Sequence, residues 1–233
     1  MRGYTKAIAI AIGVSAFTAT ALAGEVPPVK ATNAIAAADA KLQSKIDALW
    51  KKFPGRVGIA IYPPLSKDII GKRQTERFPQ QSVSKMWVAL TILEQEAAGK
   101  LSLDKRIRVS GDDVVVFSQP LKRYLDGRDS FEMPIRELLA HAINASDNLA
   151  NSVLLQLAGG PKSINKMLDR RKVTSIRFGP GEVLLQSAIA GVEWKPQYRQ
   201  GNAFKAQRSR IPMEKREAAL AAYLETPLDG AAP

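Results

Sequence analysis

The sequence contains no cysteine and a single histidine, and these scarcities exclude several kinds of chemistry. Without cysteine the chain has neither a disulfide framework nor a thiolate metal site. With His141 as its one histidine, it cannot build a zinc centre held by several imidazoles. Aromatic residues are also few, at 6% of 233 residues, whereas apolar residues reach 45% and charged residues 24%. These fractions are typical of a globular chain, so we expect any catalysis to use Ser, Lys, Asp or Glu.

The first 23 residues have the pattern of a secretory signal peptide. Arg2 and Lys6 flank the start of an apolar run that ends at Ala23, with small residues at the two positions that a signal peptidase reads. The alternative is a membrane anchor, but Ala and Thr dominate the second half of the run and make it weakly hydrophobic. We therefore expect cleavage after Ala23, a periplasmic or secreted protein, and no stable membrane insertion.

Basic residues outnumber acidic ones by 34 to 22. Cleavage after Ala23 would remove two basic residues and leave a net charge of +10. Local basic clusters occur at 170–172 and 205–210, but no basic residues repeat at helical spacing along one helix. We interpret the excess mainly as solvated surface. An acidic envelope polymer or anionic lipid is the alternative partner, and no nucleic-acid partner is expected of an exported protein.

The chain is long enough for one substantial domain or for two lobes that share a core. A flexible lead is expected over 24–33 and a helix over 34–52, followed by two short strands, at 57–62 and 68–71, that pair as a hairpin. From about residue 79 onward the pattern predicts almost only helices and loops. Helices are predicted at 82–93, from 134 toward 146, and at 148–157, 163–168 and 213–224. The fold class is therefore α/β of the α+β type, with a mixed lobe and an all-helical lobe.

A first candidate for chemistry is Ser82, which Lys85 follows three residues later. At the first turn of a buried helix this spacing places both side chains on one face. A serine hydroxyl is a weak nucleophile unless a base takes its proton, and burial lowers the pKa of a lysine toward that task. The competing interpretation is a helix-capping serine beside a surface lysine.

A second candidate is the run Ser146-Asp147-Asn148, which interrupts two apolar helical stretches. The structural interpretation is a corner between two helices with a capping residue. The functional interpretation is a second hydroxyl, on Ser146, that passes a proton to a leaving group, with Asn148 as a hydrogen-bonding group in the cleft.

Together, Ser82-Val83-Ser84-Lys85 and Ser146-Asp147-Asn148 resemble the active-site serine β-lactamases and penicillin-binding proteins, and class A β-lactamases in particular. Arg136-Glu137-Leu138-Leu139 before the second motif and Gly159-Gly160-Pro161 after it also fit, and the resemblance covers roughly residues 34–186. It implies that Ser82 attacks a lactam carbonyl and Lys85 takes or relays its proton. It also implies that Ser146 hands a proton to the departing nitrogen.

The same resemblance extends to three further residues. Glu182 matches the glutamate of the class A omega loop, which would activate the water that hydrolyses the acyl-enzyme. Gln186 stands where that family has an asparagine, and its extra methylene moves the amide by roughly an ångström. Phe117 stands where the family places an aromatic residue at the cleft entrance. The alternatives are a loop glutamate without a role and a core phenylalanine.

One motif of that family is missing, because no Lys, Arg or His in the 233 residues is followed by Ser/Thr-Gly. From the resemblance we expect a C-terminally truncated member, with a catalytic domain at 34–233 that lacks its last strands and helix. The missing strand would supply an oxyanion donor, whose loss typically costs about 3 kcal/mol of transition-state stabilisation. The hairpin would also keep exposed edges, so we expect this chain to be poorly folded and inactive as it stands.

The resemblance therefore implies an exported serine hydrolase that opens a β-lactam through an acyl-enzyme. Its substrate would be a small molecule, a β-lactam or a peptidoglycan-like compound, and it would act as a monomer without metal or organic cofactor. One alternative is a penicillin-binding or peptidase-like protein that acylates without efficient turnover. Another is a non-catalytic exported binding protein.

Overall fold

A computed structural model describes residues 29–66, 68–200 and 202–225. The predicted signal peptide over 1–23 and the first part of the predicted lead lie outside the described residues. Within the described ranges, none of the helices combines the length and the apolar character that crossing a bilayer requires.

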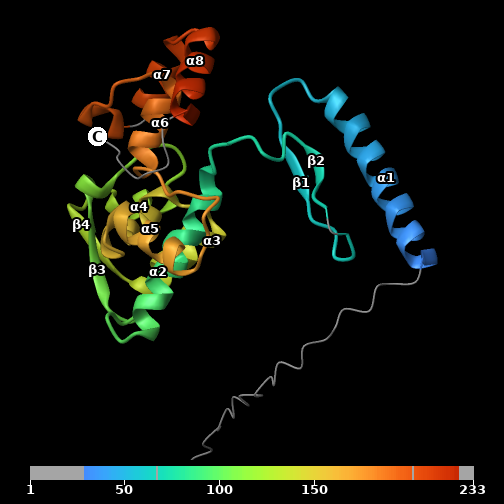
Figure 1. The fold of residues 1–233 in the computed structure, drawn as a ribbon. Helices are drawn as coiled ribbons and strands as arrows, with labels where there is room; N and C mark the ends of the chain where they lie inside the picture. Colours follow the sequence, from blue (N-terminus) through green and yellow to red (C-terminus); the bar gives the residue numbers. More distant parts are fainter. Residues whose placement is uncertain (1–28, 67, 201, 226–233) are drawn as a thin grey trace, which may run out of the picture. The chain divides into compact units, whose positions relative to one another are not determined.

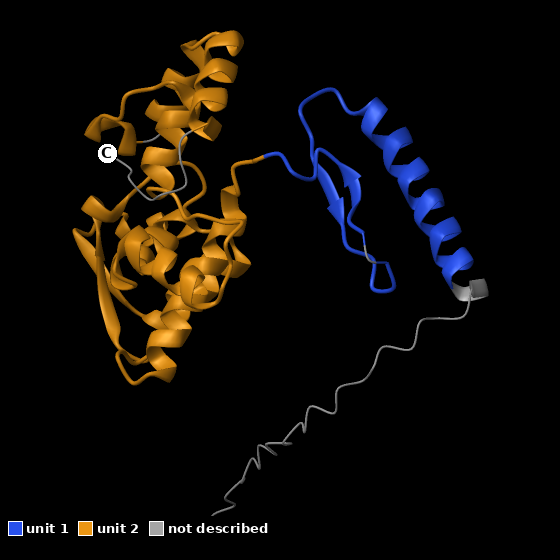
Figure 2. Cartoon of the chain, viewed as in Figure 1, with its two compact units in different colours: residues 1–76 blue, residues 77–233 orange. Residues whose placement is uncertain are grey.

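The chain forms two compact units, residues 1–76 and 77–233 (Figure 2). The boundary falls close to residue 79, where the sequence predicts the change from a mixed lobe to a helical one. Each unit is built from a continuous stretch of chain.

Unit 1 contains helix α1 (Val29–Lys52) and the strands β1 (Ile59–Ile61) and β2 (Ile70–Lys72). The strands pair antiparallel, with Ile59 opposite Lys72, so the predicted hairpin is confirmed. Gly71 is required in this pairing, because a Cβ atom there would lie only 1.9 Å from the carbonyl oxygen of Ile59. The backbone N–H of Gly71 donates a hydrogen bond to the side-chain oxygen of Gln43 in α1 at 3.2 Å, and this bond connects the hairpin to the helix.

Helix α1 begins earlier than predicted, so the expected flexible lead over 24–33 is wrong for its second half. From Val29 to Lys52 the sequence contains neither proline nor glycine, and nothing stops the helix from starting directly after Pro28.

Unit 2 is mainly helical (Figure 1). Its helices are α2 (Lys85–Ala97), α3 (Ile135–Asn144), α4 (Asn148–Leu157), α5 (Gly160–Arg170), α6 (Glu182–Ala190), α7 (Ala203–Arg210) and α8 (Met213–Glu225). Short 3₁₀ turns occur at η1 (Gln81–Ser84), η2 (Gly111–Asp113), η3 (Pro120–Leu125) and η4 (Pro196–Arg199). The predicted helices at 148–157 and 213–224 are confirmed to within one residue.

Unit 2 also contains a second hairpin. Strands β3 (Arg106–Ser110) and β4 (Ser130–Pro134) pair antiparallel, with Val109 opposite Phe131. Residues 106–109 read as a short extended piece in the sequence, and β3 confirms this, whereas its partner strand β4 departs from the expectation of almost only helices and loops. The segment 130–134 is short and ends in proline, which hides a strand from pattern analysis. Its partner lies more than twenty residues away, so the pairing depends on tertiary structure rather than on a local turn.

The core of unit 2 lies where α2, α3, α4 and α5 meet beside the β3–β4 hairpin. Its centre consists of aliphatic side chains that are almost wholly removed from solvent: Val88, Ile92, Leu138, Leu149, Leu154, Ile164 and Leu168. Burying each such side chain contributes about 1.5–3 kcal/mol, so this cluster gives the site a rigid base.

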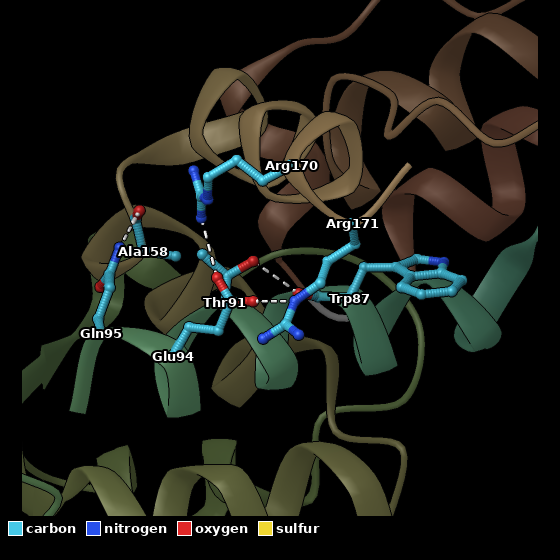
Figure 3. A network of polar contacts seen from close by, with 7 residues as sticks. All are labelled: Trp87, Thr91, Glu94, Gln95, Ala158, Arg170 and Arg171. Atoms are coloured by element: carbon cyan, nitrogen blue, oxygen red, sulfur yellow. Dashed lines mark hydrogen bonds and ion pairs between the residues drawn. The ribbon is translucent and has the colours of Figure 1, made fainter. Parts of the chain in front are cut away.

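A polar network fastens the C-terminal half of α2 to its neighbours (Figure 3). The Glu94 carboxylate accepts hydrogen bonds from Arg170 at 2.9 Å and from Arg171 at 2.6 Å, at the end of α5. Gln95 donates to the carbonyl of Ala158, directly after α4, at 2.8 Å. Two of the cations that the sequence placed on a solvated surface are therefore used to join helices.

Candidate active site

Two hydroxyls and one ammonium form a hydrogen-bonded triangle at the start of α2. Lys85 Nζ donates to Ser82 Oγ at 3.0 Å and to Ser146 Oγ at 3.3 Å. Ser146 Oγ in turn donates to Ser82 Oγ at 2.8 Å. The structure therefore brings together three of the residues that the sequence predicts, although Ser146 lies 64 positions after Ser82.

The triangle combines an exposed nucleophile candidate with a buried base candidate. Ser82 lies in η1 and is exposed, whereas Lys85, the first residue of α2, is only 3% exposed. Burial lowers the pKa of the Lys85 ammonium, and the negative charges of Glu182 and Asp147 oppose that shift. A lysine whose neutral form is favoured can accept a proton from a neighbouring hydroxyl. The interpretation of Lys85 as a surface residue is therefore wrong.

The corner between α3 and α4 holds Ser146 in an uncommon backbone conformation. Its φ angle is +51°, in the left-handed region that residues other than glycine rarely occupy. Asp147, which is fully buried, fixes the corner by accepting from Leu121 N at 2.6 Å and from Ala150 N at 2.9 Å. The second of these bonds caps α4, as the structural interpretation of the motif expects. The corner is thus a helix cap that also aims a hydroxyl at Ser82.

Asn148 connects this corner to the rest of the site. Its buried side-chain amide donates to the carbonyl of Val116 at 2.9 Å and to Glu182 Oε1 at 3.0 Å. Its backbone N–H donates to the carbonyl of Ser118 at 2.9 Å. Asn148 therefore positions both the Val116–Ser118 loop and the carboxylate.

Glu182 is the first residue of α6, directly after the Gly179-Pro180-Gly181 loop. Gly181 precedes it with a φ of +96°, and a Cβ there would lie 3.2 Å from Leu155 of α4. Glycine thus lets the chain turn into α6 close against α4. Gln186, one helical turn later, donates to Glu182 Oε1 at 3.2 Å.

The environment of Glu182 favours its neutral form. Burial raises the pKa of the Glu182 carboxyl, while Lys85 and the amides of Gln186 and Asn148 pull it downward. Lys85 and Glu182 both belong to the site of the Ser82 and Ser146 hydroxyls, and both have shifted pKa values. Such pairs are typical of acid–base chemistry.

Phe117 lies beside the site rather than among the hydrogen-bonded groups. It is 44% exposed, and its ring meets that of Phe204 in α7 edge to face, at 5.6 Å between centroids. Its place on the loop held by Asn148 agrees with a residue at the edge of a cleft, and the interpretation as a buried core residue is wrong.

Sequence reasoning missed one contact residue, Gln81. Its side-chain oxygen accepts from Gln186 Nε2 at 3.0 Å, which links η1 to α6. The one sequence feature that could have indicated Gln81 is its position next to Ser82. A contact with a residue 105 positions away produces no periodic pattern in the sequence. Within the described part of the chain, no group of three or more His, Asp or Glu side chains is placed to hold a metal ion.

Comparison with known proteins places the chain among β-lactamases. The family model described as "Beta-lactamase enzyme family" matches residues 41–218. The chain is 30% identical over 172 residues to β-lactamase OXY-2 of Klebsiella oxytoca, covering 74% of this chain and 58% of that protein. It is 28% identical over 158 residues to β-lactamase VEB-1 of Pseudomonas aeruginosa, covering 67% and 50%. The chain therefore spans little more than half the length of these curated relatives.

Solved structures agree with this result. An ancestral class A β-lactamase matches with a TM-score of 0.55 at 27% identity, over 78% of this chain and 70% of that one. A β-lactamase of Chitinophaga pinensis matches with a TM-score of 0.56 at 24% identity, which supports the fold alone. Because the family model covers well over half of the residues, the chain belongs to the β-lactamase enzyme family.

Proposed function

We propose that this chain carries the acylating centre of an exported serine hydrolase that opens the amide bond of a β-lactam. The observation that carries the proposal is the triangle of Ser82, Lys85 and Ser146, in which two hydroxyls share one buried ammonium. The family to which the chain belongs supports the same reaction class.

In the first step, Ser82 Oγ attacks the carbonyl carbon of the lactam while its proton passes to the neutral amine of Lys85. The contact of 3.0 Å between these atoms is short enough for direct transfer. The carbon–nitrogen bond of the ring then breaks. Ser146, which bonds to Lys85 and to Ser82, gives its proton to the departing nitrogen and is reprotonated from Lys85. The product is an acyl ester on Ser82.

In the second step, Glu182 removes a proton from a water molecule that attacks this ester. The bond between the acyl carbon and Ser82 Oγ then breaks, and the proton taken by Glu182 is returned to Ser82 Oγ. Asn148 and Gln186 both donate to Glu182 Oε1, which fixes one oxygen and leaves the other to accept from water. Gln186 also donates to Gln81, the neighbour of the nucleophile. This link supports a shared role for α6 and η1 in placing the water over the ester.

The proposal also covers the location, the oligomeric state and the substrate of the protein. We propose a periplasmic or secreted monomer that takes a small β-lactam or peptidoglycan-like substrate. No residue of the proposed mechanism requires a metal ion or an organic cofactor.

A fluorescent penicillin tests the proposal directly. Because the triangle is assembled, the chain should become covalently labelled despite the inactivity expected from the missing motif, and Ser82→Ala should abolish the label. Ser84→Ala is the matched control, because Ser84 lies in the same turn but donates to the carbonyl of Gln81 instead of joining the triangle. Release of the label with time indicates a lactamase, and a persistent label indicates a penicillin-binding protein. A chain without a label, or a label that survives Ser82→Ala, contradicts the proposal.

A further inference from the structure

A hollow of about 330 Å³ borders the loop that Asn148 holds through the carbonyl of Val116. Its lining includes Phe117 and Ser118 from this loop, Tyr198 from η4, and Phe204 with the cations Lys205 and Arg208 from α7. None of these residues takes part in the proposed acylation or deacylation. Its volume would accept one ring-sized group.

Aromatic rings form the apolar part of this hollow. Phe204 is 2% exposed, and the rings of Phe117 and Tyr198 meet it edge to face at centroid distances of 5.6 and 6.0 Å. Such edge-to-face clusters leave ring faces and edges for a further aromatic group to contact. The hollow therefore suits a planar ring better than a flexible aliphatic chain.

Two cations stand beside these rings, at successive turns of α7. Lys205 is exposed and Arg208 is half-buried. Among the described residues no carboxylate lies within ion-pair distance of either. By contrast, Arg170 and Arg171 of the other basic cluster share Glu94. The hollow is thus lined by positive charge that the described part of the protein does not neutralise, and it is complementary to an anion.

The hollow is held in shape by contacts that do not involve its lining. Arg199 Nε donates to the carbonyl of Val114 at 3.0 Å, and Lys122 Nζ donates to the carbonyl of Arg199 at 3.5 Å. These bonds join η4 to the chain on both sides of Phe117, at Val114 before it and at Lys122 after it. Phe117 itself has a φ of +63°, a conformation that costs energy for a residue other than glycine and persists only where its surroundings impose it. The exposed ring is therefore set in place rather than left loose.

We infer that this hollow is a specificity subsite that binds a side chain of the substrate consisting of an aromatic ring and a carboxylate. The ring lies against Phe117 and Tyr198, whose own rings pack on the buried Phe204, and the carboxylate pairs with Lys205 and Arg208. The inference rests on the proposed function for its substrate class. Asn148 holds both this loop and Glu182, and the proposed function places the other end of the bound molecule at the triangle.

The test uses fragments that contain no lactam, so it does not depend on the reaction. Phenylacetate and phenylacetamide share a ring and differ by one negative charge. NMR titration of the whole chain should give dissociation constants on the order of 1 mM, with resonances of Phe117, Tyr198 and Phe204 shifting. Phenylacetate should bind roughly 3- to 10-fold more tightly, as expected for one or two partly exposed ion pairs, and high salt should reduce this preference.

Matched variants locate the charge. Lys205→Gln combined with Arg208→Gln should remove the preference for phenylacetate and leave phenylacetamide binding unchanged. Arg210→Gln, on the same helix but outside the hollow, should preserve the preference. Equal binding of both fragments, absence of binding, or a preference that survives the double variant overturns the inference. Fragment binding by a chain that fluorescent penicillin never labels would refute the proposed function and leave the subsite intact.

Discussion

The two units of this protein bury their apolar residues to very different degrees. In unit 2 a contiguous cluster of aliphatic side chains is almost completely removed from solvent. In unit 1 the buried large apolar residues among those described are Ile46 and Ile70. Other apolar side chains of the hairpin region are exposed, including Tyr62 at 67% and Leu65 at 77%.

This difference shows where the site obtains its rigidity. Ser82, Lys85, Ser146 and Glu182 all belong to unit 2. The helices that carry or flank the first three pack into the main core, and α6, which carries Glu182, contributes Ala190 to a second, smaller apolar cluster. A two-stranded hairpin is only marginally stable by itself in water, and among its described residues unit 1 supports its hairpin with the single helix α1. The chemistry should therefore depend on the core of unit 2 and tolerate disturbance of unit 1.

The largest expected effect comes from Glu182→Gln in unit 2. Loss of the base should slow hydrolysis of the acyl-enzyme by roughly 10²–10⁴-fold while labelling of Ser82 continues. Because burial raises the pKa of Glu182, the unaltered chain should lose turnover on acidification at a pH above the ordinary carboxylate range. Stopped-flow release of a fluorescent penicillin against pH measures both effects. Equal losses in labelling and release would show that Glu182 also serves acylation or structure.

Leu138→Ala should produce the next largest effect, on stability. Leu138 in α3 has no exposed surface, and large-to-small changes at such sites cost about 2–5 kcal/mol. The matched change in unit 1 is Leu65→Ala, at a side chain that is 77% exposed, and it should cost less than about 0.5 kcal/mol. Urea unfolding followed by circular dichroism compares them. Similar losses of unfolding free energy in the two variants would mean that the Leu65 side chain is buried in solution, and would contradict the contrast between the units.

Gly71→Ala tests whether the hairpin can be disrupted without harm to the site. The new Cβ would lie 1.9 Å from a backbone oxygen of β1, so the strands must separate, at a cost of roughly 1–3 kcal/mol within unit 1. Hydrogen exchange of residues 59–72 should accelerate, and labelling of Ser82 should stay the same. Gly111→Ala, whose Cβ would meet no atom within 4 Å, is the control. Lost labelling in the Gly71 variant would show that the site needs unit 1.

How far the sequence could predict this structure depends on whether a feature is set by local spacing or by a distant partner. Ser82, Lys85 and Ser146 were found because helical spacing and a motif place them, and α4 was found because its apolar pattern is strong. The strand at 130–134 and the contact from Gln81 to Gln186 were missed, because both depend on partners far away in the chain. Local patterns predict which face is buried, but not which distant segment covers it.

The basic residues show that limit most clearly. Lys205 and Arg208 were assigned to a solvated surface, since no sequence pattern reveals aromatic rings brought beside them by η4 and α7. Arg170 and Arg171 were assigned in the same way, yet both bond to Glu94. The two basic clusters therefore look alike in the sequence, but one forms ion pairs with Glu94 and the other lines the hollow. Only the surrounding side chains distinguish them.

The smallest expected effect comes from Glu94→Gln. This change removes a polar contact on the surface of unit 2, whereas Leu138→Ala removes a core side chain, so it sharpens the comparison between the two units. Hydrogen bonds from Arg170 and Arg171 lower the pKa of Glu94 below its ordinary range. A lowered folded-state pKa contributes stability above the unfolded-state pKa, and that contribution disappears as the pH falls through the folded-state value. Glu94→Gln should therefore cost about 1 kcal/mol near pH 7, as partly exposed ion pairs do, and much less near pH 3.

Urea midpoints at the two pH values measure this, with Glu96→Gln as control, because Glu96 on the same helix has no ion-pair partner among the described residues. A loss that is equal at both pH values would mean that Glu94 acts through packing, because an electrostatic contribution must vanish once its carboxylate is protonated.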